Sequence, residues 1–218
     1  MEKEIKKGDI VFDIGAHIGY YTLIFAKLVG TEGRVYAFEP DPDNFTILNR
    51  NIEINGYSNI VTEQTAVSNQ TGRTLLHLSP NNPGDHRIYS SSDDRDYIQV
   101  DCKKLDDYFE GKQINVNFIK MDIQGSEALA AEGMRMLLER SKQLKVIIEF
   151  WPDGLKRAGT SPEVFLGSLN RSGFKFIYDI DGYNNEIRPA TIQSLITKYN
   201  DNDSRRSSTD LLLLKDNS

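Results

Sequence analysis

The stretch DIVFDIGAHIGYYTLIFAKLVGTEGRVYAFE, residues 9–39, determines the fold class. Its first seven residues are mostly apolar, which is typical of a strand buried on both faces of a sheet. A helical pattern follows from about Tyr20 to Leu28 and ends at the turn that starts with Gly30. The apolar run RVYAFE (34–39) then gives a second strand. This succession of strand, helix and strand predicts a parallel sheet and an α/β fold.

The alternation of strands and helices continues along the chain. Further strands are predicted at NIVTEQTAV (59–67), VNFIKMDI (116–123), KVIIEFW (145–151), FKFIYDI (174–180) and DLLLLK (210–215). Further helices are predicted from Asp41 or Asp43 to Asn55, over GSEALAAEGMRMLLERS (125–141), and from Ser161 to Ser172. We therefore expect about seven strands in one sheet.

Two segments depart from this pattern. Within residues 74–100, the strand-like runs TLLHL and YIQVDCK flank a polar stretch rich in turn-forming residues. We expect residues 74–100 to form an insertion over the carboxyl edge of the sheet. A second loop, of about twenty-five residues, precedes the last strand, and a compact fold usually gives such a loop a function.

Length and composition indicate one folded domain over residues 1–218. A hydrophobic content of 39% and a charged content of 27% are ordinary for a globular protein. A single cysteine, Cys102, excludes an intramolecular disulfide and fits a reducing compartment. No apolar run reaches the roughly eighteen residues of a membrane span, and the start MEKEIKKGD lacks the apolar core of a signal peptide. We therefore predict a cytoplasmic protein without a membrane span.

The charge balance argues against nucleic acid as a partner. The formal net charge is −6, whereas neutralising a phosphate backbone needs a clustered basic surface. The nearest basic pair, Arg205 and Arg206, lies among acidic and small polar residues. We therefore expect a small-molecule or glycan partner.

The loop after the first strand is the predicted ligand site. DIGAHIG (13–19) lies where open α/β sheets bind ligands, at the carboxyl ends of the strands. Gly15 and Gly19 lack a Cβ, so the backbone can turn tightly and approach a ligand closely. Their G-x-x-x-G spacing does not meet the G-x-G-x-x-G pattern that places a pyrophosphate on a helix N-terminus. The sequence thus disfavours an NAD(P)-dependent oxidoreductase, the main rival on a related fold.

S-adenosylmethionine (SAM) fits this loop better, because it has no phosphate and carries a sulfonium, an amino acid and a ribose. Asp13, at the end of the first strand, is the expected negative partner for its positive groups. Glu39, at the end of the second strand, is placed to accept hydrogen bonds from the ribose hydroxyls, as acidic residues do in nucleoside-binding folds. His17 is expected to be a turn residue or to touch the edge of the ligand rather than to be a catalyst.

Five segments together resemble successive blocks of the FkbM-type methyltransferase family. They are VFDIGAHIGYYTLIFA, GRVYAFEPDPDNFTILNRNIEING, AVSNQTG, FIKMDIQGSE and VIIEFWP, within residues 9–155. The resemblance implies a class I methyltransferase (Rossmann-like) fold, with helices on both faces of a seven-stranded, mostly parallel sheet. The implied strand order is 3-2-1-4-5-7-6, with the last strand antiparallel. It also implies SAM-dependent O-methylation of a hydroxyl on a sugar, glycan or natural product.

The same resemblance implies a set of donor-binding residues. The donor-binding loop would include Asp13, Gly15, Ala16, His17 and Gly19. Glu39 would hold the ribose beside Pro40, Asn44 would add a polar contact, and Ala66 and Val67 would line the adenine edge. The family usually has Asn in place of His17 and often Ala in place of Ser126, and neither departure should abolish donor binding.

Asp122 is the predicted general base, because it ends a buried strand in KMDIQG and would face the donor. Glu149, in the neighbouring strand, is expected either beside Asp122 or as a buried acid paired with a backbone amide or Lys120. Two carboxylates there suggest a base or a Mg²⁺ site, and no metal ligand is assigned.

His86 is the second predicted catalytic residue, because it lies in the polar loop and its ordinary pKa suits proton removal near neutrality. Trp151 could form a flat wall for the acceptor or pack in the core. A non-catalytic SAM-binding protein is the alternative function.

Overall fold

The first βαβ unit of the structure matches the predicted one. The computed structural model describes residues 3–90, 94–182, 184, 186–199 and 207–215. It contains β1 (Ile10–Ile14), α1 (Tyr20–Val29) and β2 (Arg34–Phe38) in succession. β1 and β2 are parallel, with Asp13 opposite Ala37. Both strands therefore end at the same edge of the sheet, where the ligand loop begins. Arg205 and Arg206 lie outside the described residues.

The large sheet has eight strands, one more than predicted. Its other members are β3 (Ile60–Glu63), β7 (Phe118–Met121), β8 (Lys145–Phe150), β9 (Phe174–Asp181), β10 (Glu186–Ala190) and β11 (Thr209–Lys215). The order is β10-β9-β11-β8-β7-β1-β2-β3. From β3 to β9 this is the implied order 3-2-1-4-5-7-6, and β11 is antiparallel to both neighbours. The extra strand, β10, lies within the segment expected to be a long loop and pairs with β9 at the edge.

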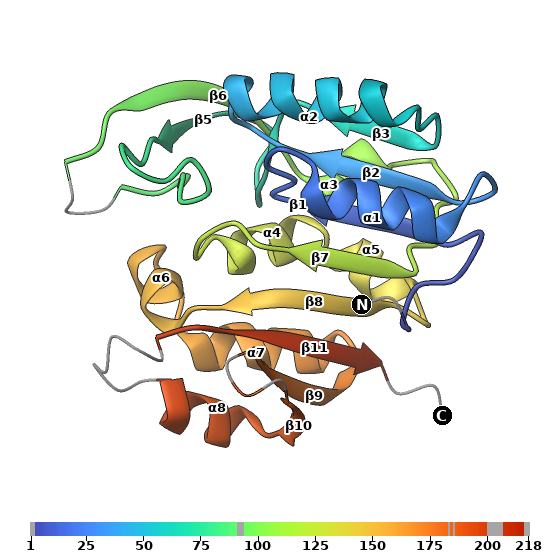
Figure 1. Cartoon of the computed structure of the whole chain (residues 1–218). Helices are drawn as coiled ribbons and strands as arrows, with labels where there is room; N and C mark the ends of the chain where they lie inside the picture. Colours follow the sequence, from blue (N-terminus) through green and yellow to red (C-terminus); the bar gives the residue numbers. More distant parts are fainter. Residues whose placement is uncertain (1–2, 91–93, 183, 185, 200–206, 216–218) are drawn as a thin grey trace.

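A second sheet holds the segment expected to be an insertion. β5 (Gly72–His77) and β6 (Tyr97–Lys103) form a hairpin, and β4 (Ala66–Val67) pairs with β6. Figure 1 shows this hairpin extending beyond the carboxyl ends of the central strands. The single strand predicted for 59–67 is therefore wrong. The chain leaves the large sheet after β3 by a tight turn, in which the Thr65 amide donates to the Glu63 carbonyl at 3.0 Å.

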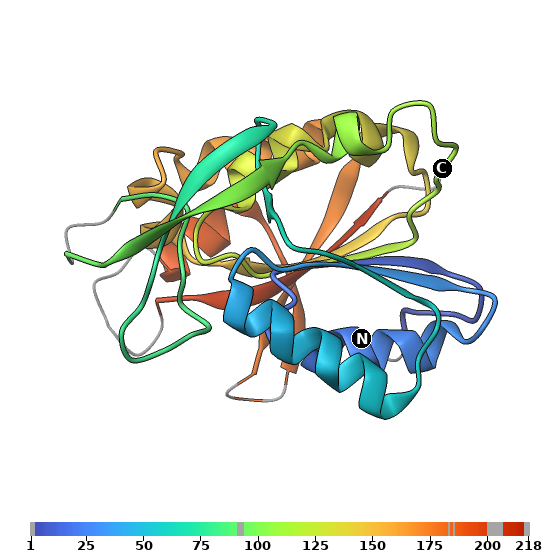
Figure 2. The ribbon, with the colours of Figure 1, turned by 90° about the horizontal axis from the view of Figure 1, so that it is seen from above.

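Helices cover both faces of the large sheet (Figure 2). α1 and α2 (Pro42–Asn55) lie on one face, and α4 (Glu127–Gly133), α5 (Arg135–Arg140) and α7 (Pro162–Arg171) lie on the other. Three further helices, which the sequence did not predict, are α3 (Leu105–Tyr108), α6 (Pro152–Arg157) and α8 (Ile192–Tyr199).

The helix predicted for 125–141 is broken into α4 and α5. A Cβ on Gly133 would lie only 1.9 Å from the Ser68 carbonyl oxygen, so the backbone passes directly against the chain after β4. Met134 then adopts φ −125° and ψ 23°, which interrupts the helix. This contact places the end of α4 beside Ser68, the residue that follows β4.

The core explains why β1 is almost uniformly apolar. Phe12 and Ile14 pack with the helices of the α4–α7 face, whereas Val11 packs with Phe25 of α1 on the other face. All four side chains are fully buried. A strand buried on both faces has no solvent side on which polar residues could alternate. Among the described residues, no helix is long and apolar enough to cross a membrane.

Candidate active site

A pocket lies at the carboxyl edge of the large sheet, between the strand ends and the hairpin. It has about 550 Å³ of space not filled by atoms, including the part open to solvent. Eight of the predicted site residues line it, namely Gly15, Glu39, Pro40, Asn44, Ala66, Val67, His86 and Asp122. The structure thus brings together segments that are up to about a hundred residues apart in the sequence.

The turn after β1 is fixed to the end of β2 by backbone hydrogen bonds. The amides of Gly15 and Ala16 both donate to the Phe38 carbonyl, each at 3.0 Å. Gly15 has φ 78°, and a Cβ there would lie 2.1 Å from the Asp122 carbonyl oxygen. Glycine is therefore required at this position by the neighbouring strand as well as by closeness to the pocket. Gly19 is different, because its Cα faces Leu48 of α2 rather than the pocket lining.

Asp13 is fully buried and does not line the pocket. Its Oδ2 accepts a hydrogen bond from the Thr22 hydroxyl at 2.6 Å, and its Oδ1 lies 3.9 Å from the Lys120 ammonium. Burial raises the pKa of Asp13, and the charge of Lys120 offsets part of that rise. Strand alternation points Asp13 toward α1, so the expected direct contact with a positive ligand group is not supported. Its contacts with Thr22 and Lys120 instead hold the end of β1 in place.

Glu39 is the buried carboxylate that does face the pocket. Its Oε2 accepts from the His17 amide at 2.7 Å, and its Oε1 accepts from the Asp41 amide at 3.0 Å. The Asn44 side chain also hydrogen-bonds this carboxylate, which keeps lone-pair capacity for a further donor. Burial raises the pKa of Glu39 to about 7. His17 adopts φ 51°, which directs its amide at Glu39.

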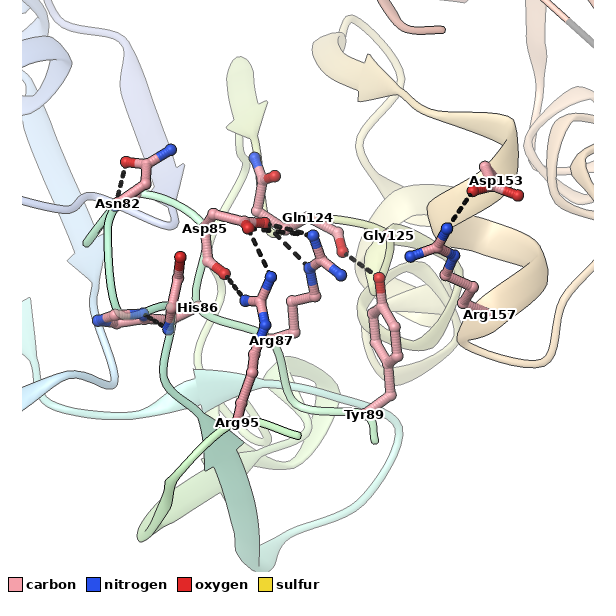
Figure 3. A network of polar contacts seen from close by, with 12 residues as sticks. Asn82, Asp85, His86, Arg87, Tyr89, Arg95, Gln124, Gly125, Asp153 and Arg157 are labelled. Carbon is pink, nitrogen blue, oxygen red and sulfur yellow. Dashed lines mark hydrogen bonds and ion pairs between the residues drawn. The ribbon is translucent and has the colours of Figure 1, made fainter. Parts of the chain in front are cut away.

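The hairpin covers the Glu39 end of the pocket. The Asn44 side-chain amide donates to the Pro83 carbonyl at 3.2 Å. His86 accepts from the Ser79 amide through Nδ1 at 3.0 Å, and its Nε2 lies 3.7 Å from Asp41 Oδ2. Figure 3 shows the His86 ring pointing away from Gln124. Burial lowers the pKa of His86, which favours the neutral form. Because Nδ1 accepts from the Ser79 amide, that neutral form carries its proton on Nε2.

This arrangement leaves His86 no open nitrogen lone pair for taking a proton from an acceptor. Its catalytic role therefore stays a prediction, and the geometry favours holding the hairpin onto the start of α2 instead.

Asp122 belongs to a polar group at the other end of the pocket. Its side chain is 41% exposed, and its Oδ1 accepts from Gln124 Nε2 at 2.8 Å. The same nitrogen donates to Glu149 Oε2 at 3.1 Å. Lys120 Nζ lies 3.6 Å from Asp122 Oδ2. Burial and the charge of Asp122 raise the pKa of Glu149 to about 9, so Glu149 is protonated at neutral pH.

Gln124 connects Asp122 to the hairpin. Its φ of 55° is unusual for a residue with a side chain. Its carbonyl accepts from the Tyr89 hydroxyl at 2.9 Å, as Figure 3 shows. Strained residues that the surrounding structure holds in place are often found at active sites. The sequence did not point to Gln124 or Tyr89, because neither the φ angle nor the path of the hairpin can be read from residue types.

The hairpin loop is held by one carboxylate. Asp85 binds Arg87 at 2.8 Å and Arg95 at 2.7 Å (Figure 3). The Arg87 guanidinium lies 4.8 Å from the centre of the Trp151 ring, and that of Arg157 lies 5.8 Å from it. These contacts favour the packing role for Trp151 over a free wall for an acceptor.

No group of three His, Cys, Asp or Glu side chains in the described part of the chain could hold a metal ion. The Lys120 ammonium instead lies between Asp13 and Asp122. Burial by itself would lower the pKa of Lys120, but these two carboxylates raise it above its ordinary value. A positive charge thus already lies beside Asp122, one of the two carboxylates that suggested Mg²⁺. The lysine in the middle of the largely apolar run VNFIKMDI was the available signal for Lys120.

Comparison with known proteins identifies one family model and several methyltransferases that are similar to this chain. The family model described as a methyltransferase FkbM domain matches residues 13–176. The chain is 28% identical to Methyltransferase 1 of Beauveria bassiana over 57% of each chain. It is 24% identical to the hexuronic acid methyltransferase AglP of Haloferax volcanii over 63% of this chain and 54% of that protein.

A shorter match, at 41% identity, covers 35% of this chain and 29% of the 31-O-demethyl-FK506 methyltransferase FkbM of Streptomyces tacrolimicus. These alignments span about half or less of the lengths of the relatives.

Solved structures show the same fold. A methyltransferase FkbM from Methylobacillus flagellatus superposes with a TM-score of 0.54 at 21% identity, over 96% of this chain and 44% of that one. A SAM-dependent O-methyltransferase from Thermotoga maritima gives a TM-score of 0.53 at 13% identity, over 97% and 60% of the two chains. At these identities the likeness establishes the fold class alone, with one strand more than the seven expected.

Proposed function

This chain belongs to the methyltransferase FkbM domain family, and we propose that it transfers a methyl group from SAM to a hydroxyl oxygen of a sugar, glycan or other small molecule. The observation that supports this proposal most directly is that a single pocket has a carboxylate at each of its two ends. The Glu39 carboxylate, which can still accept hydrogen bonds, lines one end, and the Asp122 carboxylate lines the other. A nucleoside-containing methyl donor and a hydroxyl acceptor need these two groups.

The residues of the pocket fit SAM without a phosphate site. Glu39 would hold the ribose, because a ribose hydroxyl can donate to a carboxylate whose oxygens are already fixed by two backbone amides. Gly15 brings the backbone of the loop to the pocket, where a Cβ has no room. Val67 and Ile123 supply apolar walls for a flat ring. When bound, SAM supplies a methyl group on an activated sulfonium leaving group.

Most of the work left to the protein is positioning. Holding two reactants in the right geometry contributes up to roughly 7–11 kcal/mol in well-oriented reactions. A hydroxyl is a weak nucleophile at neutral pH, so a base that removes its proton adds about 10² to 10⁴-fold in rate. We assign this proton transfer to Asp122. Gln124 orients its Oδ1, and the Lys120 ammonium lies 3.6 Å from its Oδ2.

The acceptor class follows the relatives. One relative is named as a hexuronic acid methyltransferase, and another is named as a methyltransferase of 31-O-demethyl-FK506. We therefore propose an oxygen acceptor on a small polyhydroxylated molecule. We also propose that the hairpin and the large sheet act as one unit, since residues of both line the pocket.

A transfer assay with isotopically labelled methyl SAM tests the proposal against a panel of uronic acids, neutral sugars and hydroxylated macrolides. Label recovered in an acceptor, together with S-adenosylhomocysteine (SAH), is the expected result. Binding of SAM without transfer to any member of the panel would favour the non-catalytic SAM-binding alternative.

A further inference from the structure

The pocket has an apolar region beside Glu39, formed where β4, the hairpin and the loop after β7 meet. Val67, Leu76, Ile88 and Ile123 line it, and Val67 and Leu76 are buried. Apolar walls suit the faces of an aromatic ring, but a purine also has ring nitrogens and an exocyclic amine along its edge. If such groups are buried, each needs a hydrogen-bond partner.

Ser126 supplies a polar group in this region. Its side chain lines the same pocket and the residue is only 1% exposed. Its hydroxyl has no hydrogen-bond partner among the residues that the structure describes. Its backbone is fully used, since the amide donates to the Ile123 carbonyl at 3.3 Å and the carbonyl accepts from the Ala130 amide at 3.1 Å. A buried hydroxyl without a partner is costly, so a ligand that supplies one would be favoured.

The other polar side chains of the pocket are already engaged within the protein. Glu39, Asn44, His86 and Asp122 make the hydrogen bonds described above, and the Thr65 hydroxyl donates to the Ala66 carbonyl at 3.2 Å. Within the described pocket lining, the Ser126 hydroxyl is the polar side-chain group that still needs a partner.

Ser126 lines the pocket together with the two residues assigned to the adenine edge, Ala66 and Val67. It directly precedes α4, and Gly133 at the far end of α4 contacts Ser68, the residue after β4. The Asp122 carboxylate, by contrast, contacts Gln124 and Lys120. A ring attached to a ribose at Glu39 would therefore reach Ala66, Val67 and Ser126, while the acceptor would approach Asp122.

We propose that the Ser126 hydroxyl hydrogen-bonds the polar edge of the donor's purine ring and contributes to the recognition of adenine. This assignment rests on the proposed function, because it takes a SAM-like nucleoside as the ligand. The hydroxyl can donate to a ring nitrogen or accept from the exocyclic amine.

Calorimetric titration with SAH tests the assignment without any acceptor. Ser126→Ala should weaken SAH binding about threefold to tenfold, the effect of one hydrogen bond. Ser141→Ala is the matched control, because Ser141 is fully buried, its hydroxyl also has no partner among the described residues, and it does not line the pocket. The control should bind SAH as the wild type does. Both variants should unfold at or above the wild-type temperature.

A set of SAH analogues that lack single purine nitrogens, at positions 1, 3 or 7, or that carry an oxo group in place of the amine, locates the contact. One of them should bind the wild type at least threefold more weakly than SAH but bind Ser126→Ala with no further loss. Equal SAH affinity in wild type and Ser126→Ala, or equal losses for every analogue in both, would overturn the assignment alone. Failure of the wild type to bind SAH would overturn the proposed function together with it.

Discussion

The two ends of the pocket are built differently. At the Glu39 end, the carboxylate is 5% exposed and fixed by two backbone amides from nearby turns. At the Asp122 end, the carboxylate is 41% exposed and oriented by a side chain, Gln124, which in turn contacts Tyr89 of the hairpin. The backbone thus positions the proposed donor contact, whereas a side chain, itself in contact with the hairpin, positions the proposed base. Changes at the two ends should therefore have separable effects.

Asp122→Asn should have the largest effect. Asparagine keeps an oxygen that can accept from Gln124, but it cannot take a proton. We expect turnover to fall about 10² to 10⁴-fold, while SAM affinity changes little. Measurement of kcat beside calorimetric SAM affinity checks this. A variant with near wild-type kcat would show that another group is the base, or that none is needed.

Glu39→Ala should lower the affinity for SAM. Loss of the carboxylate should weaken SAM binding at least about tenfold, as expected for a hydrogen-bonded charged group. Since the pKa of Glu39 is about 7, wild-type SAM binding should also weaken as the pH falls from 8 to 6, because protonation removes acceptor capacity. Titrations of both proteins at these two pH values check the prediction. Unchanged affinity in the variant would remove the ribose assignment.

Glu149→Gln should change the free energy of unfolding, and it tests the environment of the Asp122 end of the pocket. In the folded chain the pKa of Glu149 is about 9, above its ordinary value of 4.5. The stabilising contribution of its protonated form is therefore complete below pH 4.5 and is lost as the pH rises through 9. Glutamine keeps an acceptor for Gln124 and does not ionise. The variant should thus exceed the wild type by on the order of 1 kcal/mol in unfolding free energy at pH 8, and match it near pH 4.5.

Urea unfolding at both pH values measures this difference. Glu53→Gln, at an exposed position on α2, is the control and should show no comparable gain at pH 8. A wild type as stable as Glu149→Gln at pH 8 would show that Glu149 is not forced to hold its proton.

Tyr89→Phe should have the smallest effect. It removes only the hydrogen bond from the Tyr89 hydroxyl to the Gln124 carbonyl. We expect kcat to fall about twofold to fivefold with SAM affinity unchanged, because Asp122 would be oriented less well. Steady-state kinetics at saturating SAM measure it. A loss confined to SAM affinity would place Tyr89 at the donor end and contradict the comparison.

The Glu39 end of the pocket could be predicted from the sequence more fully than the Asp122 end. The turn after β1 and Glu39 at the end of β2 are adjacent features of one βαβ unit, and the fold confirms their placement at one edge. The contact of Asp13 with the donor stays a prediction, and the structure shows its carboxylate buried against Thr22 and Lys120 instead of lining the pocket. The expected strand 59–67 failed because its second half pairs with the hairpin, a partner about thirty-five residues later in the chain.

The Asp122 end was only partly predictable. Asp122 and Glu149 could be named from their strands, but the contacts that orient them could not. Gln124 acts through its φ angle, and Tyr89 through the path of the hairpin. The break at Gly133 also depends on a contact between distant parts of the chain. These features come from tertiary packing, which residue patterns within one segment do not report.

The central claim is that the pocket binds SAM, and calorimetric titration of the purified chain with SAM, NAD⁺ and NADP⁺ tests it most directly. The account predicts micromolar binding of SAM with one site per chain and no heat of binding from either dinucleotide. Binding of a dinucleotide without binding of SAM would contradict it.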